Sequence, residues 1–187
     1  MFHHCTNILS VELNHYIQGK MALQGPFVSI AMISNSRIES KYPNGIAMYL
    51  VDIVSIALRS SPNEYVPQGG GFVVRKLPEA FSLYFLFSIS NIPTDLLKNL
   101  ELLTHVAAFF QQKPHFDKQN TPALQECGME NFSVELVRMS ASEKSLLWKS
   151  LHVPYTPSLL YKVGLLFVEE TATKSAPQVS AFRWFQK

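Results

Sequence analysis

Hydrophobic side chains recur along this chain with two different spacings, which predict different elements. Residues 6–18 carry apolar side chains every three or four positions, so they predict an amphipathic helix that Gly19 ends. Two apolar runs rich in β-branched residues follow, Phe27–Ser34 and Ile46–Leu58, and each predicts a strand. The polar residues 35–45 between the two runs predict a loop.

The clearest alternation of apolar positions lies in FSLYFLFSIS, residues 81–90. Every second residue from Phe81 to Ile89 is apolar, whereas the residues between them are mixed. This pattern predicts a strand with one face in the core and the other only partly covered. The preceding residues 59–79 contain three prolines and the triplet Gly69–Gly71, a composition that predicts a loop.

Helical spacing returns after Pro93, where Thr94 and Asp95 provide a helix start and Pro114 a stop. The residues predicted to form the buried stripe of this helix are Leu96, Leu100, Leu103, Ala107 and Phe110. Apolar residues then alternate again between Phe132 and Val137, which predicts a further strand.

The run LLWKSLHVPYTPSLLYKVGLLF, residues 146–167, joins a helix end, a turn and a strand. The helix is predicted to begin at Ser140, which forms a capping box with Glu143. Pro154 and Pro157 cannot continue a helix and favour extended backbone before them, so a strand is predicted at 159–169.

The apolar stripe of this helix is predicted to consist of Leu146, Leu147 and Leu151. Trp148 lies beside the stripe, and its leucine neighbours favour a place in the core over an interface.

These elements predict one α+β domain, with a mixed, mostly antiparallel sheet covered on one face by about three α-helices. Residues 1–170 form the predicted domain. Residues 171–187 are predicted to be a polar linker followed by an aromatic tail, Val179–Phe185.

Composition narrows the classes of function. The net charge of the 187 residues is +2 and no run of Lys or Arg occurs, so nucleic acid is not a predicted partner. Hydrophobic residues make up 47% and charged residues only 16%, which predicts a surface buried against other proteins. No apolar stretch is long enough for a membrane span and the N-terminal residues do not resemble a leader, so a cytoplasmic product without membrane contact is expected.

No catalytic, cofactor or metal site is predicted, so the chain is not expected to be an enzyme. His3, His4 and Cys5 are adjacent in sequence and cannot converge on one metal ion as separated ligand pairs do. Gly69–Gly71 is not followed by the Lys and Ser or Thr of a phosphate-binding loop. Cys5 and Cys127 form no Cys-x-x-Cys motif and are both expected to be reduced.

Some residues are instead candidates for contacts between subunits. Asp52 is the one charge in its apolar run, so it either faces solvent or pairs with a cation, Arg59 or Arg37 in its own chain or one in a neighbour. Tyr155 and Tyr161 either anchor an interface or pack the turn between helix and strand.

The aromatic tail is a further candidate. Phe182, Trp184 and Phe185 follow a polar linker, and such a segment can add a strand to an open sheet edge, in a partner or in its own chain.

Three segments taken in order, 81–90, LLTHVAAFFQQKPHF at 102–116, and 146–167, identify a family. Together they resemble the N-terminal domain of the terminator, or cap, proteins of contractile injection systems of the antifeeding-prophage and virulence-cassette type. The resemblance runs from about residue 6 to residue 170.

The resemblance implies a fold like that of phage tail terminators and a structural role. It implies a homohexameric ring, of this chain alone or shared with a paralogue, that binds the inner tube protein and the sheath protein and stops their polymerisation. The ring would assemble in the bacterial cytoplasm as part of a particle that is released or docked on a membrane. Two alternatives remain open, a baseplate or tube-adaptor component of the same machine and a stand-alone enzyme.

Overall fold

The computed structural model describes residues 1–21, 25–34, 37–39, 41, 45–56, 63–68, 71–76, 79–89, 96–167 and 174–176. The chain divides into two compact units. The first contains Met1–Val54 and Ser82–Leu165, and the second contains Ser55–Phe81 and Leu166–Lys187. The domain boundary placed at residue 170 stays a prediction.

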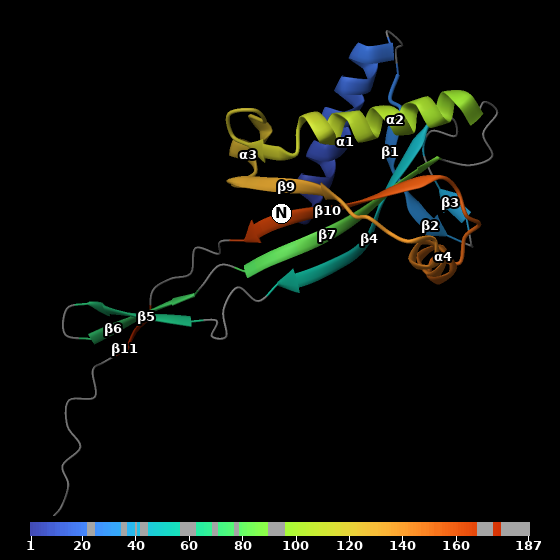
Figure 1. The fold of residues 1–187 in the computed structure, drawn as a ribbon. Coiled ribbons are helices and arrows are strands. Elements are labelled where there is room, and N and C mark those ends of the chain that lie inside the picture. The colour runs from blue at the N-terminus through green and yellow to red at the C-terminus, as the bar shows by residue number, and fades with distance from the viewer. Residues whose placement is uncertain are drawn as a thin grey trace, which may run out of the picture. The chain divides into compact units, whose positions relative to one another are not determined.

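The first unit carries helices packed on a six-stranded sheet (Figure 1). Its helices are α1 (Phe2–Met21), α2 (Leu96–Gln112), α3 (Ala123–Glu126) and α4 (Ala141–Ser150). Across the sheet the strands are β1 (Val28–Ile30), β4 (Ile46–Ile56), β7 (Glu79–Ile89), β10 (Ser158–Phe167), β9 (Asn131–Leu136) and β8 (His115–Asp117).

The sheet contains both kinds of strand pairing. β1 runs parallel to β4, with Val28 opposite Ile46, whereas β9 pairs antiparallel with both β10 and β8. The predicted α+β class with a mixed sheet is therefore confirmed. No element is predicted for β8 and α3, because three and four residues are too few to show a periodicity.

β7 is the strand on which the first unit is built, because both of its faces are buried. The side chains that alternate toward α1 and α2 are buried as predicted: Leu83, Phe85, Phe87 and Ile89. On the opposite face, Leu86 belongs to a second hydrophobic cluster with Tyr49 of β4 and Trp148 of α4. Figure 1 shows α1 and α2 on one side of the sheet and α4 on the other.

The expectation that helices cover a single face of the sheet is therefore wrong. The serines on the second face of β7 suggest contact with water, but Ser82 and Ser88 are 2% and 0% exposed. The hydroxyl groups of Ser88 and Tyr49 lie 2.5 Å apart and hydrogen-bond to each other. A tertiary contact thus satisfies Ser88 on this face, whereas Oγ of Ser82 is buried with no hydrogen-bond partner among the described residues.

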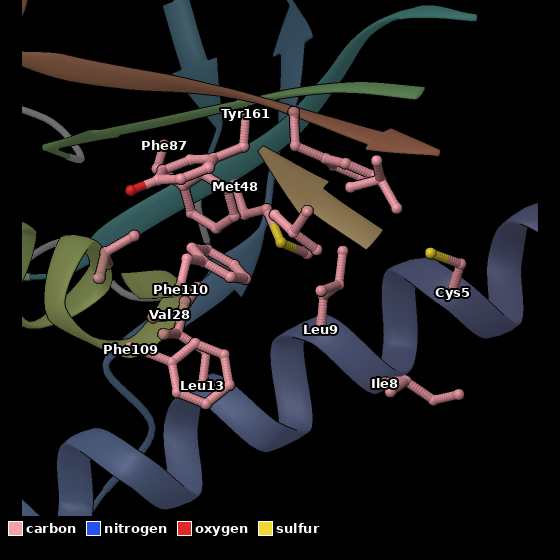
Figure 2. Close-up of a cluster of buried hydrophobic side chains, with 14 of the residues drawn as sticks. Cys5, Ile8, Leu9, Leu13, Val28, Met48, Phe87, Phe109, Phe110 and Tyr161 are labelled. Carbon is pink, nitrogen blue, oxygen red and sulfur yellow. The ribbon is translucent and has the colours of Figure 1, made fainter. Parts of the chain in front are cut away.

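Aromatic rings fill the core between α1, α2 and the sheet (Figure 2). The ring centroid of Phe110 lies 4.6 Å from that of Tyr161 and 5.5 Å from that of Phe87. Leu9 and Leu13 of α1 are fully buried in the same cluster. Full burial of each such side chain contributes about 1.5–3 kcal/mol, so this cluster is the main source of stability.

The buried face of α2 differs from the predicted stripe. Leu103 and Phe110 are buried, but Leu96 and Leu100 are 50% and 37% exposed. The residues that α2 buries are Asn99, Leu102, Leu103, Val106, Phe109 and Phe110. Leucines occur on more than one side of this helix, so helical spacing fits several stripes, and packing selects the stripe that carries both phenylalanines.

α1 begins earlier than predicted and continues past Gly19 to Met21. Two side-chain contacts hold its last turn, the first to a residue outside the helix and the second within it. The side-chain amide of Gln18 donates to the carbonyl of Gly25 over 3.0 Å, and the Nζ of Lys20 lies 5.6 Å from the ring centre of Tyr16. These contacts offset the cost of a glycine in the helix, which is about 1 kcal/mol.

In the second unit, the strands β5 (Asn63–Gln68), β6 (Gly71–Lys76) and β11 (Lys174–Ala176) form a sheet in the order β11-β6-β5. β5 and β6 pair antiparallel up to Gln68 and Gly71. The prediction of a loop at 59–79 is therefore wrong for both strands, because Val, Tyr and Phe residues favour strands on either side of the glycines. β11 falls within the predicted linker.

The predicted loop at 35–45 contains a strand as well. β2 (Met32–Ser34) and β3 (Arg37–Glu39) form an antiparallel pair with Ile33 opposite Ile38. The predicted strand Phe27–Ser34 is divided into β1 and β2 at Ala31, whose N–H donates to the carbonyl of Met48 over 2.9 Å.

The side chain of Asn14 attaches the edge strand β1 to α1. Its Nδ2 donates to the carbonyls of Ser10 and Val28, both at 2.8 Å. Its Oδ1 accepts from the N–H groups of Phe27 at 2.7 Å and Val28 at 2.9 Å. The amide thus uses both donor and both acceptor positions. It satisfies backbone groups on the side of β1 where a neighbouring strand would otherwise pair.

We expect Asn14→Ala to lower the free energy of unfolding by about 2–3 kcal/mol, because it leaves two partly buried N–H groups unsatisfied. Urea unfolding followed by circular dichroism measures this change. Asn131→Ala, at an exposed position on β9, is the matched control and should change stability by less than about 0.5 kcal/mol. Equal effects of the two substitutions would contradict the role of Asn14.

Candidate assembly surfaces

α4 begins at the capping box that the sequence predicts. The N–H of Glu143 donates to Oγ of Ser140 over 3.3 Å, and the N–H of Ser140 donates to Oε2 of Glu143 over 2.7 Å. Hydrogen bonds from Ser140 lower the pKa of the Glu143 carboxyl group. The only acidic side chain of α4 is therefore occupied at the start of the helix.

The side of α4 that faces the sheet is centred on Trp148. Leu147 and Leu151 are half-buried, but Leu146 is 65% exposed, so its predicted place in the buried stripe is wrong. Leu146 precedes Trp148 by two positions, about 200° around the helix, and therefore points away when Trp148 points inward. Trp148 is 2% exposed, which confirms that it belongs to the core.

Trp148 connects α4 to the turn and the strand that follow. Its indole Nε1 donates to Oγ of Ser158, at the start of β10, over 3.3 Å. Its ring meets that of Tyr155 edge to face, with 5.7 Å between centroids. The prolines in this turn flank Tyr155 closely, so the exposed tyrosine is held in a rigid segment.

The structure separates the two candidate tyrosines. Tyr155 is 60% exposed and offers most of its ring to a partner. Tyr161 is 3% exposed and lies in the aromatic core, and burial raises the pKa of its hydroxyl group to about 12. Tyr161 therefore has no side-chain surface to offer, because its position on β10 points to the face that α2 covers.

Asp52 is exposed on the outer half of β4, as the solvent-facing alternative expects. Its Oδ1 accepts a hydrogen bond from the N–H of Ile53 over 2.8 Å. Arg59 lies outside the described residues, as does the aromatic tail with Phe182, Trp184 and Phe185. A pairing of Asp52 with a cation of the same or a neighbouring chain stays a prediction.

β4 is much longer than the edge strand that covers it. β1 pairs with β4 at Ile46–Met48, so among the described residues no strand lies along this edge of β4 beyond Met48. Apolar side chains are exposed there, with Leu50 at 38% and Ile53 at 42%. An open strand edge with apolar side chains is a surface to which another chain can add a strand.

Further exposed apolar side chains lie next to this edge. Ile30 is 51% and Met32 is 69% exposed, and both line a shallow hollow with Leu50 and with Phe2 of α1. The sequence pattern assigns such residues to the core. The length of the apolar run at 46–58, which exceeds that of the runs around it, is the sequence signal that could have revealed an exposed strand end.

The described residues contain no group of three or more His, Cys, Asp or Glu side chains that could hold a metal ion. Burial raises the pKa of the Cys5 thiol to about 12, which makes it a poor nucleophile. His105 is half-buried with its ring 6.5 Å from that of Tyr16, and His115 is exposed on β8. None of the helices in the described ranges is long and apolar enough to cross a membrane.

The sequence profile of one protein family, described as the Pvc16 N-terminal domain, matches residues 4–181. The matched range contains all three segments on which the sequence resemblance rests and extends beyond residue 170. The resemblance is therefore confirmed. A search of curated proteins found no match.

The solved structures that are similar to the chain include two terminator proteins. The PVC sheath/tube terminator of an extracellular contractile injection system, in its extended state, superposes with a TM-score of 0.60 at 14% identity, over 100% of this chain and 63% of that chain. The anti-feeding prophage cap, a tube terminating cap, has a TM-score of 0.48 at 15% identity, over 94% of this chain and 61% of that chain. The chain thus spans less than two thirds of either relative, and the first likeness establishes a shared fold.

We expect Trp148→Ala to lower the free energy of unfolding by about 3–5 kcal/mol, because it leaves a cavity between α4 and the sheet. Tyr155→Ala should cost less than about 1 kcal/mol, because most of that ring is already in water. Urea unfolding of both variants measures the difference. A loss for Tyr155→Ala as large as that for Trp148→Ala would show that Tyr155 supports the fold rather than forming a surface.

Proposed function

Because the chain belongs to the Pvc16 N-terminal domain family, we propose that it is a structural cap of a contractile injection system. In this role it binds the distal end of the inner tube and the sheath and stops their polymerisation. The observation that carries the proposal is the family match over residues 4–181. The fold shared along the whole chain with a PVC sheath/tube terminator supports it.

A cap must bind the growing face of the tube without presenting an equivalent face for the next ring. Each layer of a tube built from stacked rings presents an unfinished face, and growth continues as long as each added ring offers that face again. A protein that binds the last ring without offering an equivalent face ends the tube. Such a protein works by binding alone, so the proposal includes no enzymatic step.

The proposed cap is a hexameric ring, formed by this chain alone or together with a paralogue. The open edge of β4 supports contacts between copies, because its backbone and its exposed Leu50 and Ile53 can accept a strand from a neighbouring subunit. A heterologous contact of this kind closes into a ring of six when it rotates each subunit by one sixth of a full turn with no rise along the axis. Asp52 lies on the same edge, where a cation of the neighbour could pair with it.

The remaining candidates are proposed contacts to the tube and sheath. Tyr155 offers an exposed ring on a rigid turn. The tail residues Phe182, Trp184 and Phe185 offer three aromatic side chains within four positions, a composition typical of interface anchors. The particle would assemble in the bacterial cytoplasm before its release or its docking on a membrane.

We expect particles produced without this chain to contain inner tubes of variable length, because nothing would occupy the growing end. Length distributions in negative-stain electron micrographs, with and without the chain supplied from a plasmid, measure the effect. A complete absence of particles would favour the alternative role in the baseplate or as a tube adaptor. Unchanged lengths would contradict both roles.

We expect Ile53→Lys to prevent ring formation, because it places a charge at the open edge of β4 while changing stability by only about 0.5 kcal/mol at an exposed position. Light scattering of the purified chain at increasing concentration measures the size of the assembly. Leu97→Lys is the matched control, since Leu97 is 79% exposed and belongs to α2 rather than to β4. A ring that persists in Ile53→Lys would place the subunit contact elsewhere.

A further inference from the structure

One flank of α4 carries a shallow groove, of which the roles described above use only Tyr155. Ala141, Ser145 and Trp148 follow one another at helical spacing and line it from one end to the other. Ala141 and Ser145 are small and exposed, so another chain can approach the helix closely. Trp148 and Val153 also line it and are the least exposed of these residues, at 2% and 8%.

The charged side chains along the groove are basic. Lys144, Lys149 and His152 all line it, and Lys149 and His152 are exposed. Within the described ranges, neither lysine has a carboxylate partner. The carboxylate of Glu143, which could offset them, instead accepts hydrogen bonds from Ser140. In the described part of the chain, the two lysines along the groove are therefore free to pair with the carboxylates of a partner.

The far end of the groove is marked by a fixed aromatic side chain. Tyr155 is 60% exposed and rests edge to face on Trp148. Trp148 is itself held by its hydrogen bond to Ser158. An exposed ring on a rigid support loses little conformational entropy on binding, which is the property of interface anchors.

We propose that the groove along α4 binds an acidic segment of a partner protein, with an apolar side chain of that segment against Tyr155. The charge complementarity of Lys144 and Lys149 carries the choice of partner. The two lysines are five positions apart, about 7.5 Å along the helix axis and about 140° around it, so they match spaced carboxylates better than one compact anion. The groove also has an apolar surface, so a peptide that carries both acidic and apolar side chains fits it better than a purely acidic one.

The experiment uses the full chain with the substitution Trp184→Phe, which leaves Trp148 as its one tryptophan. The probe is a peptide of about twelve residues with glutamates on both sides of a central Leu-Phe pair, and the comparison is the same peptide with glutamine in place of glutamate. Trp148 fluorescence measures binding. We expect the acidic peptide to bind about tenfold more tightly at low salt, and the advantage to shrink at high salt.

Substitutions then test the residues. The double substitution Lys144→Gln with Lys149→Gln should weaken binding of the acidic peptide by about fivefold to tenfold, because two partly exposed charges are lost. It should leave binding of the glutamine peptide unchanged. Tyr155→Ala should weaken binding of both peptides. Lys20→Gln, at an exposed position near the end of α1, removes the same single charge as Lys149→Gln alone. It should have no effect, whereas Lys149→Gln alone should weaken binding of the acidic peptide.

Equal binding of the two peptides would overturn the proposal. So would an affinity for the acidic peptide that stays the same when both lysines are replaced. Each readout concerns the isolated chain and a peptide. The result is therefore independent of the tube lengths that test the role as a cap.

Discussion

The burial of β7 on both faces is the constraint on which the first unit depends. One face requires α1 and α2, whose aromatic and leucine side chains meet Phe85 and Phe87. The other packs against α4 in the cluster of Leu86, Tyr49 and Trp148, and there the hydroxyl groups of Tyr49 and Ser88 hydrogen-bond to each other. A central strand with two apolar contacts must be covered by layers on both sides, so the positions of the helices follow from this strand.

The candidate surfaces lie where neither a strand nor a helix layer covers the sheet and its helices completely. β1 has three residues and β4 has eleven, so β4 leaves a free edge whose apolar side chains no strand of the described chain covers. α4 is held at its start by Ser140 and at its inner side by Trp148. The groove along its flank is consequently held in one defined orientation, with Lys144, Lys149 and Tyr155 in its lining. The same contacts that stabilise the unit therefore fix what it offers to partners.

Local signals in the sequence were reliable guides where they involved neighbouring residues. The capping box at Ser140, the alternation along β7 and the strand after Pro157 all occur as predicted. The candidate surfaces were less accessible to such reasoning. Asp52 and Tyr155 are exposed, but Tyr161 is buried. The sequence did not predict the basic groove, because Lys144 and Lys149 line one groove with Tyr155 only after α4 has packed through Trp148.

The sequence by itself determined the local elements, the α+β class and the family, because these depend on spacing and on short motifs. Tertiary structure alone decided which side of each helix is buried. A helix with leucines on several sides, such as α2, fits more than one stripe, and only the neighbouring β7 and β10 select the stripe with Phe109 and Phe110. It also decided that both faces of the sheet are covered and that β4 extends beyond β1, because these depend on partners distant in the sequence.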